Sequence, residues 1–310
     1  MKKLKYLGLT IMLICSLFFV FGFANIQAQA QENLSLKIGI MPAVDSAPIL
    51  LAQEKGYYND LNLEMKIDIY TNAVNRQSAL QTGKLDGAMT DLIAFVNNVN
   101  NDFPIKITTS TDGSFPFLVK KDFEEKEEID IGMMEISVTN FLSEQFLKDE
   151  YKLNKIYISA IPARLEMVKS GQLDMSIIPE PMASMGELSG LEKRVYENEY
   201  DFTPEAMIFT ETALKQKSEA IARFHQAYNR AVQDIRKNDS EAREVLIKSL
   251  KLKPAIKDQI VMPKYHYTRV PTKSYLNYVI SWIESKQNEE INIPYERMVE
   301  EQFIKNDQSK

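Results

Sequence analysis

The sequence predicts an α/β protein built from two similar lobes, and an internal repeat is the first reason for this prediction. Residues 78–89 and 166–177 share one phrase, in which a helix-forming stretch stops at Gly83 or Gly171 and an apolar run then begins with Leu-Asp. Glycine favours the left-handed conformation that closes a helix, and the apolar run has the composition of a buried strand. Each phrase also follows an apolar run. Each copy is therefore expected to fold as strand, helix and strand.

Alternation of strands with helices predicts a mostly parallel sheet, flanked by helices, in each lobe. Apolar or alternating stretches bounded by turn residues indicate the elements of the first lobe. The predicted strands are 34–40, 63–70, 85–90 and 105–110, and the predicted helices are 49–56, 75–82 and 91–98. Right-handed crossovers join parallel strands, and ligands bind beyond the carboxyl ends of such strands. The loops after the strands are therefore where we expect a site.

Two apolar strands are expected to carry the chain between the lobes. The first is residues 115–120, which precede an acidic stretch that we interpret as solvated surface, and the second is the β-prone segment 206–210. Between them, the predicted strands are 129–134, 155–158 and 175–178, with a helix at 139–151 and the repeat helix before Gly171. Two crossings predict a two-strand hinge. The expected boundaries are 31–115 and 207–310 for the first lobe and 116–206 for the second.

The last third of the chain is expected to be helical. Prolines punctuate its segments, and the predicted helices are 211–236, 240–250, 256–262, 274–285 and 295–304. Trp282 lies on the fourth of these, and we expect it to anchor that helix to the first lobe.

The N-terminus has the features of a secretory signal peptide. Three lysines precede an apolar stretch from about residue 7 to residue 23, and Ala28-Gln29-Ala30 precedes the first acidic residue. Cleavage near Ala30 would remove residues 1–30 and leave a periplasmic or otherwise extracytoplasmic protein. A retained membrane anchor is the alternative, since roughly 20 apolar residues can span a bilayer. A lipid anchor on Cys15 is not expected, because Ile14 precedes it where bacterial lipoproteins usually have a small residue.

Composition excludes several classes of function. Cys15 is the only cysteine, so the mature chain has no disulfide, thiolate metal site or cysteine nucleophile. The chain carries 37 basic and 43 acidic residues, and loss of the signal lysines makes it more negative still. With no basic stripe, nucleic acid is not expected as a partner. His225 and His266 have no carboxylate at ligand spacing and are interpreted as structural. No metal or cofactor is expected.

Several motifs together resemble a known family. The strand 38–40 is followed by Pro48 and by Ala-Gln-Glu-Lys-Gly-Tyr-Tyr at 52–58, and Ile-Ile-Pro-Glu-Pro stands at 177–181 after the second repeat copy. With the proline-punctuated segment 263–299, this order resembles the extracytoplasmic substrate-binding proteins of ABC importers that serve nitrate, sulfonates, taurine and thiamine precursors. The resemblance covers nearly the whole mature chain.

The resemblance implies a two-lobed periplasmic-binding-protein fold of type II with a two-strand hinge. It also implies a monomer without chemistry of its own, which captures a small organic molecule or oxyanion between the lobes. An ABC permease in the cytoplasmic membrane, with its ATPase, is the implied partner. A ligand bound by both lobes would favour the closed state.

Polar residues after the predicted strands are the candidate ligand contacts. The candidates are Asp45, Ser46, Thr90, Asp91, Thr109, Ser110 and Asp112 in the first lobe and Ser137, Thr139, Asn140 and Glu180 in the second. A helix N-terminus at 137–140 could hold an anion through its backbone N–H groups. Helix capping is the alternative role for any one of these residues, because Ser, Thr, Asn and Asp are the usual N-cap residues.

The charges of the candidates point in two directions. Asp45, Asp91 and the other candidate acids face few cations, which favours a neutral or positively charged ligand over a sulfonate or nitrate. Arg76 and Arg164 begin the two repeat helices and could instead clamp an anionic group from both lobes. A surface position is the alternative for both arginines.

Two other functions compete with transport. A ligand-sensing or partner-docking protein could use the same fold. A eukaryotic branch of the fold family synthesises the thiamine pyrimidine, and it is recognised by a cysteine-rich motif and a histidine. The mature chain lacks cysteine, and no pairing of a nucleophile with a base is evident, so an enzyme is not expected. Thiamine-precursor pyrimidines, sulfonates, nitrate and other small molecules are the candidate ligands.

Overall fold

A computed structural model describes residues 34–198 and 200–304. The predicted signal peptide, with Cys15 and the cleavage site near Ala30, lies outside these residues. The chain from residue 34 onward forms one compact unit. None of the helices in the described part is both long and apolar enough to cross a bilayer.

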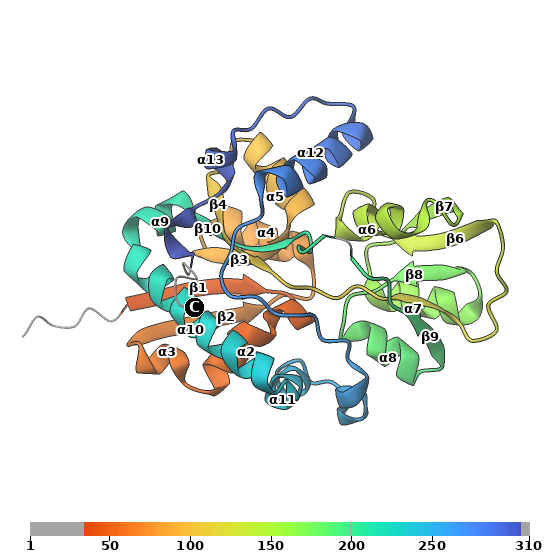
Figure 1. The fold of residues 1–310 in the computed structure, drawn as a ribbon, viewed down its shortest axis with the longest axis horizontal. Helices are drawn as coiled ribbons and strands as arrows, with labels where there is room; N and C mark the ends of the chain where they lie inside the picture. The colour runs from red at the N-terminus through yellow and green to blue at the C-terminus, as the bar shows by residue number, and fades with distance from the viewer. Residues whose placement is uncertain (1–33, 199, 305–310) are drawn as a thin grey trace, which may run out of the picture. The chain divides into compact units, whose positions relative to one another are not determined.

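The first sheet combines four parallel strands with one antiparallel strand. Its order is β2-β1-β3-β10-β4, and β10 runs antiparallel to both of its neighbours. The strands are β1 (Leu34–Ile40), β2 (Leu63–Ile69), β3 (Gly87–Asp91), β4 (Ile105–Thr111) and β10 (Glu205–Thr210). Its connecting segments are η1 (Val44–Ser46), α2 (Ala47–Glu54), α3 (Tyr57–Asp60), α4 (Ala73–Gln81) and α5 (Leu92–Asn100) (Figure 1). β10 joins the first sheet after the chain has formed the second, as the predicted return strand does.

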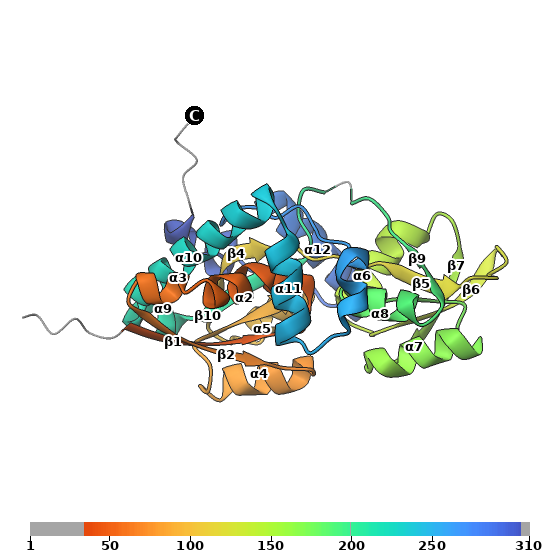
Figure 2. The same cartoon turned by 90° about the horizontal axis from the view of Figure 1, so that it is seen from below.

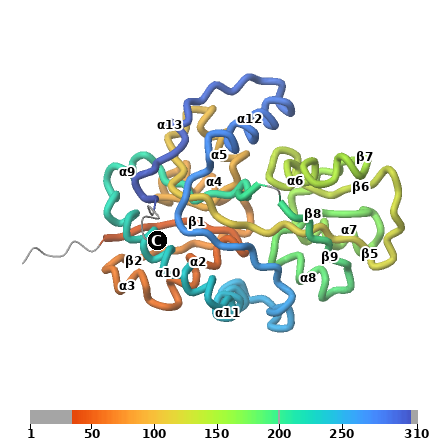
Figure 3. The backbone as a smooth tube through the Cα atoms, viewed as in Figure 1, coloured from red at the N-terminus to blue at the C-terminus, as the bar shows by residue number. Residues whose placement is uncertain are grey.

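The second sheet repeats this arrangement. Its order is β7-β6-β8-β5-β9, again with one antiparallel strand in the fourth place. The strands are β5 (Phe117–Lys120), β6 (Glu128–Met133), β7 (Lys152–Tyr157), β8 (Met175–Ile177) and β9 (Leu191–Arg194), and the helices are α6 (Val138–Leu147), α7 (Ile161–Ser170) and α8 (Met182–Leu188). The chain passes between the two groups of strands before β5 and again before β10 (Figure 3). The prediction of two α/β lobes with mostly parallel sheets is confirmed.

The internal repeat is visible in matching contacts. The Asp86 carboxylate accepts the backbone N–H of Lys37 at 2.8 Å, and the Asp174 carboxylate accepts that of Asp130 at 2.7 Å. In return, the N–H groups of both aspartates donate to the carbonyls of the same two residues. Each aspartate therefore fastens the strand that follows its helix to the first strand of its own sheet. Figure 2 shows α4 and α7, the two repeat helices, along the same side of the molecule.

A glycine on β1 and the matching glycine on β6 allow close packing of the repeat leucine. A Cβ on Gly39 would lie 2.7 Å from Cδ1 of Leu85, and a Cβ on Gly132 would lie 2.5 Å from Cδ1 of Leu173. Both distances are shorter than a carbon–carbon contact allows. The leucine of each Leu-Asp pair therefore packs directly on the backbone of β1 or β6.

The C-terminal third covers the first sheet and differs in detail from the prediction. It contains α9 (Glu211–Gln216), α10 (Ser218–Lys237), α11 (Ser240–Ser249), η2 (Pro254–Gln259), α12 (Lys273–Gln287), α13 (Tyr295–Met298) and η3 (Glu301–Phe303). The single helix expected at 211–236 is wrong, because Lys217 leaves the helical conformation between α9 and α10. The α-helix expected at 256–262 is a 3₁₀ turn that begins at Pro254.

The prediction that Trp282 anchors α12 to the first lobe is wrong. The indole Nε1 donates to Oε2 of Glu144 at 2.6 Å, and the ring lies edge-on to Phe141, 5.5 Å away. Both partners belong to α6, which flanks the second sheet. Lys286 also reaches Glu144, at 2.6 Å. Since α12 contacts α5 as well, the helix joins elements of both lobes.

Candidate functional site

Three acidic side chains lie together where β3 and β4 end and β10 begins. Glu205 opens β10 and is paired in register with Asp91 on one side and Thr111 on the other. Asp45, on η1, lies against the same edge, with its Oδ2 at 3.5 Å from the Thr111 hydroxyl. The sheet and the loop after β1 thus bring together residues from four separate parts of the sequence.

Arg76 is the cation of this group. It projects from α4, is only 4 % exposed, and donates from Nη2 to the Thr90 hydroxyl at 3.0 Å. Its stem lies over Gly39, where a Cβ would come within 3.2 Å of the arginine Cγ. Its charge interacts with Asp45, Asp91 and Glu205. The surface position considered for Arg76 is therefore wrong, as it is for Arg164, which is 1 % exposed.

Burial makes the acids of this group reluctant to ionise. Burial raises the pKa of Asp45 to about 7, and the nearby Arg76 charge only partly opposes this change. The pKa of Glu205 is raised well above its usual range by burial and then by the charges of Asp45 and Asp91. Burial also raises the pKa of Asp91. One guanidinium faces three carboxylates, of which those of Asp45 and Glu205 are buried, so part of the group stays protonated near neutral pH.

Two buried atoms of the group have no hydrogen-bond partner among the described residues. They are Oδ1 of Asp45 and Nε of Arg76. Buried polar atoms in folded proteins are nearly always paired, and an unpaired one marks a place where a ligand or water can bind. We call the set Asp45, Arg76, Thr90, Asp91, Thr111 and Glu205 the acid–arginine group.

The other candidates of the first lobe are held by local or loop contacts. The Ser46 hydroxyl donates to the Ala43 carbonyl at 2.7 Å. The Thr109 hydroxyl accepts the N–H of Arg269 at 3.1 Å, and the N–H of Ser110 donates to the Arg269 carbonyl at 2.6 Å. The Ser110 hydroxyl is buried without a partner in the described part of the chain. Thr109 and Ser110 therefore fix the segment that carries Arg269 along the end of β4.

Asp112 belongs to a charged network around the chain crossings. Its carboxylate accepts the backbone N–H of His266 at 2.8 Å and lies 2.9 Å from the Nδ1 of the same histidine. Arg269 donates to Asp112 at 3.3 Å and to Asp201 at 2.5 Å. Asp112 follows β4 at the first crossing, and Asp201 precedes β10 at the second. His266 and Arg269 therefore tie the two crossings together.

In the second lobe, the 137–140 candidates cap a helix. Ser137 is the N-cap of α6 and accepts the N–H of Thr139 at 3.2 Å, and the Thr139 hydroxyl accepts the N–H of Met134 at 3.0 Å. Asn140 donates to the Glu135 carbonyl at 2.5 Å, and its Oδ1 is buried without a partner among the described residues. Capping is thus confirmed for Ser137, and for Asp91, which accepts the N–H of Ala94 at the start of α5.

Glu180 is fully buried and both of its carboxylate oxygens are bound by protein donors. They accept the N–H and hydroxyl of Ser184, the Nζ of Lys193 at 2.9 Å and the N–H of Val261 at 3.1 Å. Its carbonyl also accepts the N–H of Val44, next to Asp45, at 3.0 Å. Because Val44 and Val261 belong to segments around the first sheet, Glu180 fastens the second sheet's loop to the first lobe.

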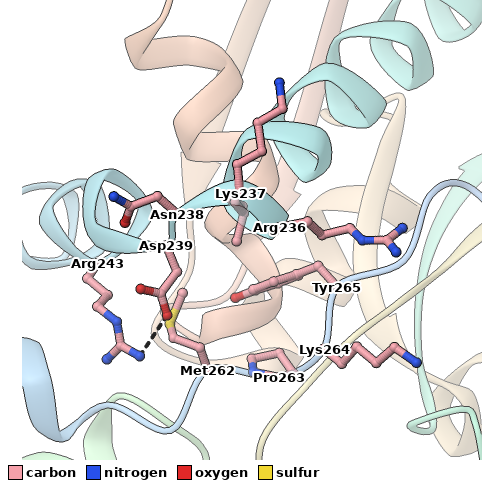
Figure 4. Close-up of a pocket in the computed structure, with 10 residues that line it drawn as sticks. Arg236, Lys237, Asn238, Asp239, Arg243, Met262, Pro263, Lys264 and Tyr265 are labelled. Carbon is pink, nitrogen blue, oxygen red and sulfur yellow. Dashed lines mark hydrogen bonds and ion pairs between the residues drawn. The ribbon is translucent and has the colours of Figure 1, made fainter.

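Two cavities lie away from these residues, on α10. The larger, of about 560 Å³, is lined by residues 235–239, Arg243 and residues 262–265. In Figure 4, Arg243 turns towards Asp239, to which it is bonded, while Lys237 and Lys264 point away from each other. The second, of about 430 Å³, is lined by residues of α10 and by Phe303. Neither contains a candidate predicted from the sequence.

Glu205 and Thr111 are the members of the acid–arginine group that the sequence analysis did not name. The candidates were expected at the carboxyl ends of strands. Glu205 instead stands at the amino end of β10, which reaches the same edge of the sheet because β10 runs antiparallel. The signal was present: Glu205 is an acid directly before the predicted return strand. Among the described residues, no three His, Cys, Asp or Glu are grouped so as to hold a metal ion.

Comparison with known proteins bears on the fold. Residues 43–118 match the family described as NMT1/THI5 like. No curated protein matches the sequence.

Solved structures resemble the chain over most of its length. A ligand-binding component of an ABC-type import system from Staphylococcus aureus, with zinc bound, superposes with a TM-score of 0.74 at 16 % identity, covering 87 % of this chain and 97 % of that one. The periplasmic aliphatic sulphonate-binding protein SsuA from Escherichia coli gives 0.67 at 14 % identity over 86 % and 97 %. The periplasmic nitrate-binding protein NrtA from Synechocystis PCC 6803 gives 0.61 at 13 % identity over 87 % and 92 %. The chain has the periplasmic-binding-protein fold.

Proposed function

We propose that this protein is the extracytoplasmic solute-binding component of an ABC importer. It captures a small molecule between its two lobes and delivers it to a permease that works with an ATPase. The observation that carries the proposal is the acid–arginine group, a buried set of polar side chains with unpaired atoms at the carboxyl edge of the first sheet. Ligands of open α/β sheets bind at that edge, and the similar solved structures are binding components of import systems.

The lobes are divided at the two crossings. We assign residues 31–115 and 207–310 to the first lobe and residues 116–206 to the second. This division agrees with the sheets, since β5 to β9 fill the second sheet between Phe117 and Arg194 and β10 rejoins the first. A ligand that touches both lobes stabilises the closed state by its difference in affinity for the closed and open states.

Each lobe contributes a different part of the site. In the first lobe, Asp45, Thr90, Asp91 and Glu205 contact the ligand, and Arg76 balances part of their charge. In the second lobe, the N-terminus of α6 presents Ser137, Thr139 and Asn140, of which Asn140 has a free oxygen. Asp112 and Glu180 act indirectly, by holding the crossings and the loop after β8 in place.

The protein acts outside the cytoplasm, after cleavage of its signal peptide near Ala30, as a monomer that catalyses no reaction. N-terminal sequencing of the exported protein tests the cleavage, and size-exclusion chromatography with light scattering tests the monomer. A sensor of the same fold would bind ligand equally well. The two roles separate in a growth assay: deleting the gene abolishes ligand uptake if the protein serves a transporter, and it leaves uptake intact if the protein is a sensor.

Native mass spectrometry of residues 31–310, purified from a bacterial periplasm, tests the binding function directly. A small co-purified mass, absent after denaturation and refolding, is the expected result. A protein that carries no such mass, and whose melting temperature is unchanged by every fraction of a metabolite extract, would contradict the proposal. A ligand present at 100 times its Kd should add roughly 2.7 kcal/mol to the free energy of unfolding.

A further inference from the structure

We infer that the ligand presents a positively charged or N–H-rich group, such as an amidinium, guanidinium or ammonium, to Asp45 and Glu205, and that oxyanions are not its class. This inference rests on the proposed function, because it concerns the ligand of the same site. The inference assigns a charge to the ligand. The similarity to sulphonate-binding and nitrate-binding proteins does not determine that charge.

When the acids of the group are ionised, the charges that face Asp45 and Glu205 are mainly negative. The Arg76 guanidinium interacts electrostatically with three carboxylates, those of Asp91, Glu205 and Asp45. Arg164, the matching arginine of the second lobe, donates instead to the Ile158 carbonyl at 2.6 Å. The nearby Asp112 is paired with Arg269 at 3.3 Å and lies 2.9 Å from Nδ1 of His266.

The remaining titratable neighbours are neutral phenols. Tyr228 and Tyr265 lie within the electrostatic reach of Asp45, and Tyr275 lies within that of Glu205. Burial raises the pKa of all three hydroxyls, so none of them ionises near neutral pH. The hydroxyl of Tyr265 already donates to the Val44 carbonyl at 2.7 Å. The phenols therefore leave the negative balance of the site unchanged.

Of the two unpaired atoms of the group, Oδ1 of Asp45 indicates a donor that the ligand supplies, whereas Nε of Arg76 is itself a donor. Asp45 is 5 % exposed, its Oδ2 faces the Thr111 hydroxyl, and its Oδ1 lacks any hydrogen-bond partner within the described residues. The Glu205 carboxylate is 9 % exposed, and the charges that act on it are those of Asp45, Asp91 and Arg76. A buried carboxylate oxygen can be satisfied only by a donor, and a charged donor forms the stronger bond. An oxyanion supplies acceptors alone, so the ionised carboxylates would repel it, and it would need their protonated forms or Nε of Arg76 as donors.

A pH dependence follows from the same geometry. The pKa of Asp45 is about 7 in the free protein, because burial outweighs the attraction of Arg76. A cation binds to the ionised carboxylate, so below neutral pH it must displace a proton. Its affinity should rise between pH 6 and pH 8, by at most about tenfold per pH unit for each proton displaced from Asp45 or Glu205. An anion would show the opposite trend.

Isosteric probes of opposite charge test the inference. Benzamidine and benzoate have nearly the same shape, as have guanidinium and nitrate, and each pair can be titrated into ¹⁵N-labelled protein and followed by NMR. The variants are Asp45→Asn and Glu205→Gln, and the matched control is Glu64→Gln, an acid-to-amide change at an exposed position on β2. We expect the cations to shift resonances near η1 and β10, with affinity at least tenfold lower in the two variants and unchanged in the control.

Three results would overturn the inference. The first is binding of benzoate or nitrate at this site, strengthened by Asp45→Asn or Glu205→Gln. The second is binding of neither cation at up to 20 mM. The third is an anionic ligand found by native mass spectrometry of the purified protein; it would contradict the charge assignment while supporting the receptor function. Loss of the receptor function is a separate outcome, in which no metabolite fraction binds at all.

Discussion

The sequence predicts Glu180 as a ligand contact, whereas its hydrogen bonds indicate that it stabilises the fold, and replacing it by alanine separates the two roles. The Glu180 side chain is fully buried and Lys193 is 6 % exposed. Removing one partner of a buried ion pair costs about 3–5 kcal/mol, because the other partner and its donors are left unpaired. Lys193 retains Glu187 at 2.9 Å, so the lower end applies. We expect Glu180→Ala to lower the free energy of unfolding by about 3 kcal/mol.

Urea unfolding at pH 7, followed by circular dichroism, measures this loss. Lys193→Met provides the other half of a double-mutant cycle, and the coupling energy of the pair should be about 1–3 kcal/mol. Glu187→Gln is the control, since a partly exposed pair contributes about 1 kcal/mol or less. Stability within about 1 kcal/mol of the wild type, together with weakened ligand binding, would refute the structural role and restore Glu180 to the binding site.

Three further predictions concern other acids and the single tryptophan. Asp86→Ala and Asp174→Ala should each lower stability by about 1–3 kcal/mol in urea unfolding, since each leaves a backbone N–H without its acceptor; equal stability of the variants and the wild type would contradict this. Asp45→Asn should raise stability at pH 8, by at most about 4 kcal/mol, and leave it unchanged at pH 4. The pKa of Asp45 is raised to about 7, so the wild type loses stability as the pH rises from 4 to 7, and a gain that persists at pH 4 would disprove this cause. Glu144→Gln should shift the emission of Trp282, the only tryptophan, because its indole N–H loses a charged acceptor; an unchanged spectrum would count against the contact.

The repeated part of the fold could be predicted because its signals are local. The glycines that close the two helices, Gly83 and Gly171, have the positive φ expected at such a position, and the Leu-Asp pair follows directly in the chain. Leu85 and Leu173 pack on glycine backbone, while Asp86 and Asp174 hold the adjacent strand. A pattern that appears twice also provides its own check, since two accidental matches in register are improbable.

The elements that escaped prediction depend on partners far away in the sequence. β9 has the sequence Leu-Glu-Lys-Arg, which lacks the apolar alternation of a strand, and it pairs only with β5 at the edge of its sheet. The side chain of Lys193, on β9, is buried because its Nζ donates hydrogen bonds to the Glu180 carboxylate and to the Gln259 carbonyl. The break at Lys217 is similar, since the Lys217 side chain reaches Asp86, in the first repeat copy, at 2.8 Å. A prediction from the residue propensities of a short stretch of sequence takes none of these distant partners into account.

The candidate acids illustrate why a site is harder to predict than a fold. Asp45, Asp91 and Asp112 give the same local signal, an acid shortly after a strand, yet each has a different role. Asp91 caps its own helix, which the next three residues already indicate. Asp112 is bound by His266, 154 residues further along the chain, and no local pattern indicates that partner. Asp45 alone keeps a buried oxygen without a partner in the described chain. The residue best placed to bind a ligand is thus the one whose partner the chain does not supply, and only the packed structure reveals it.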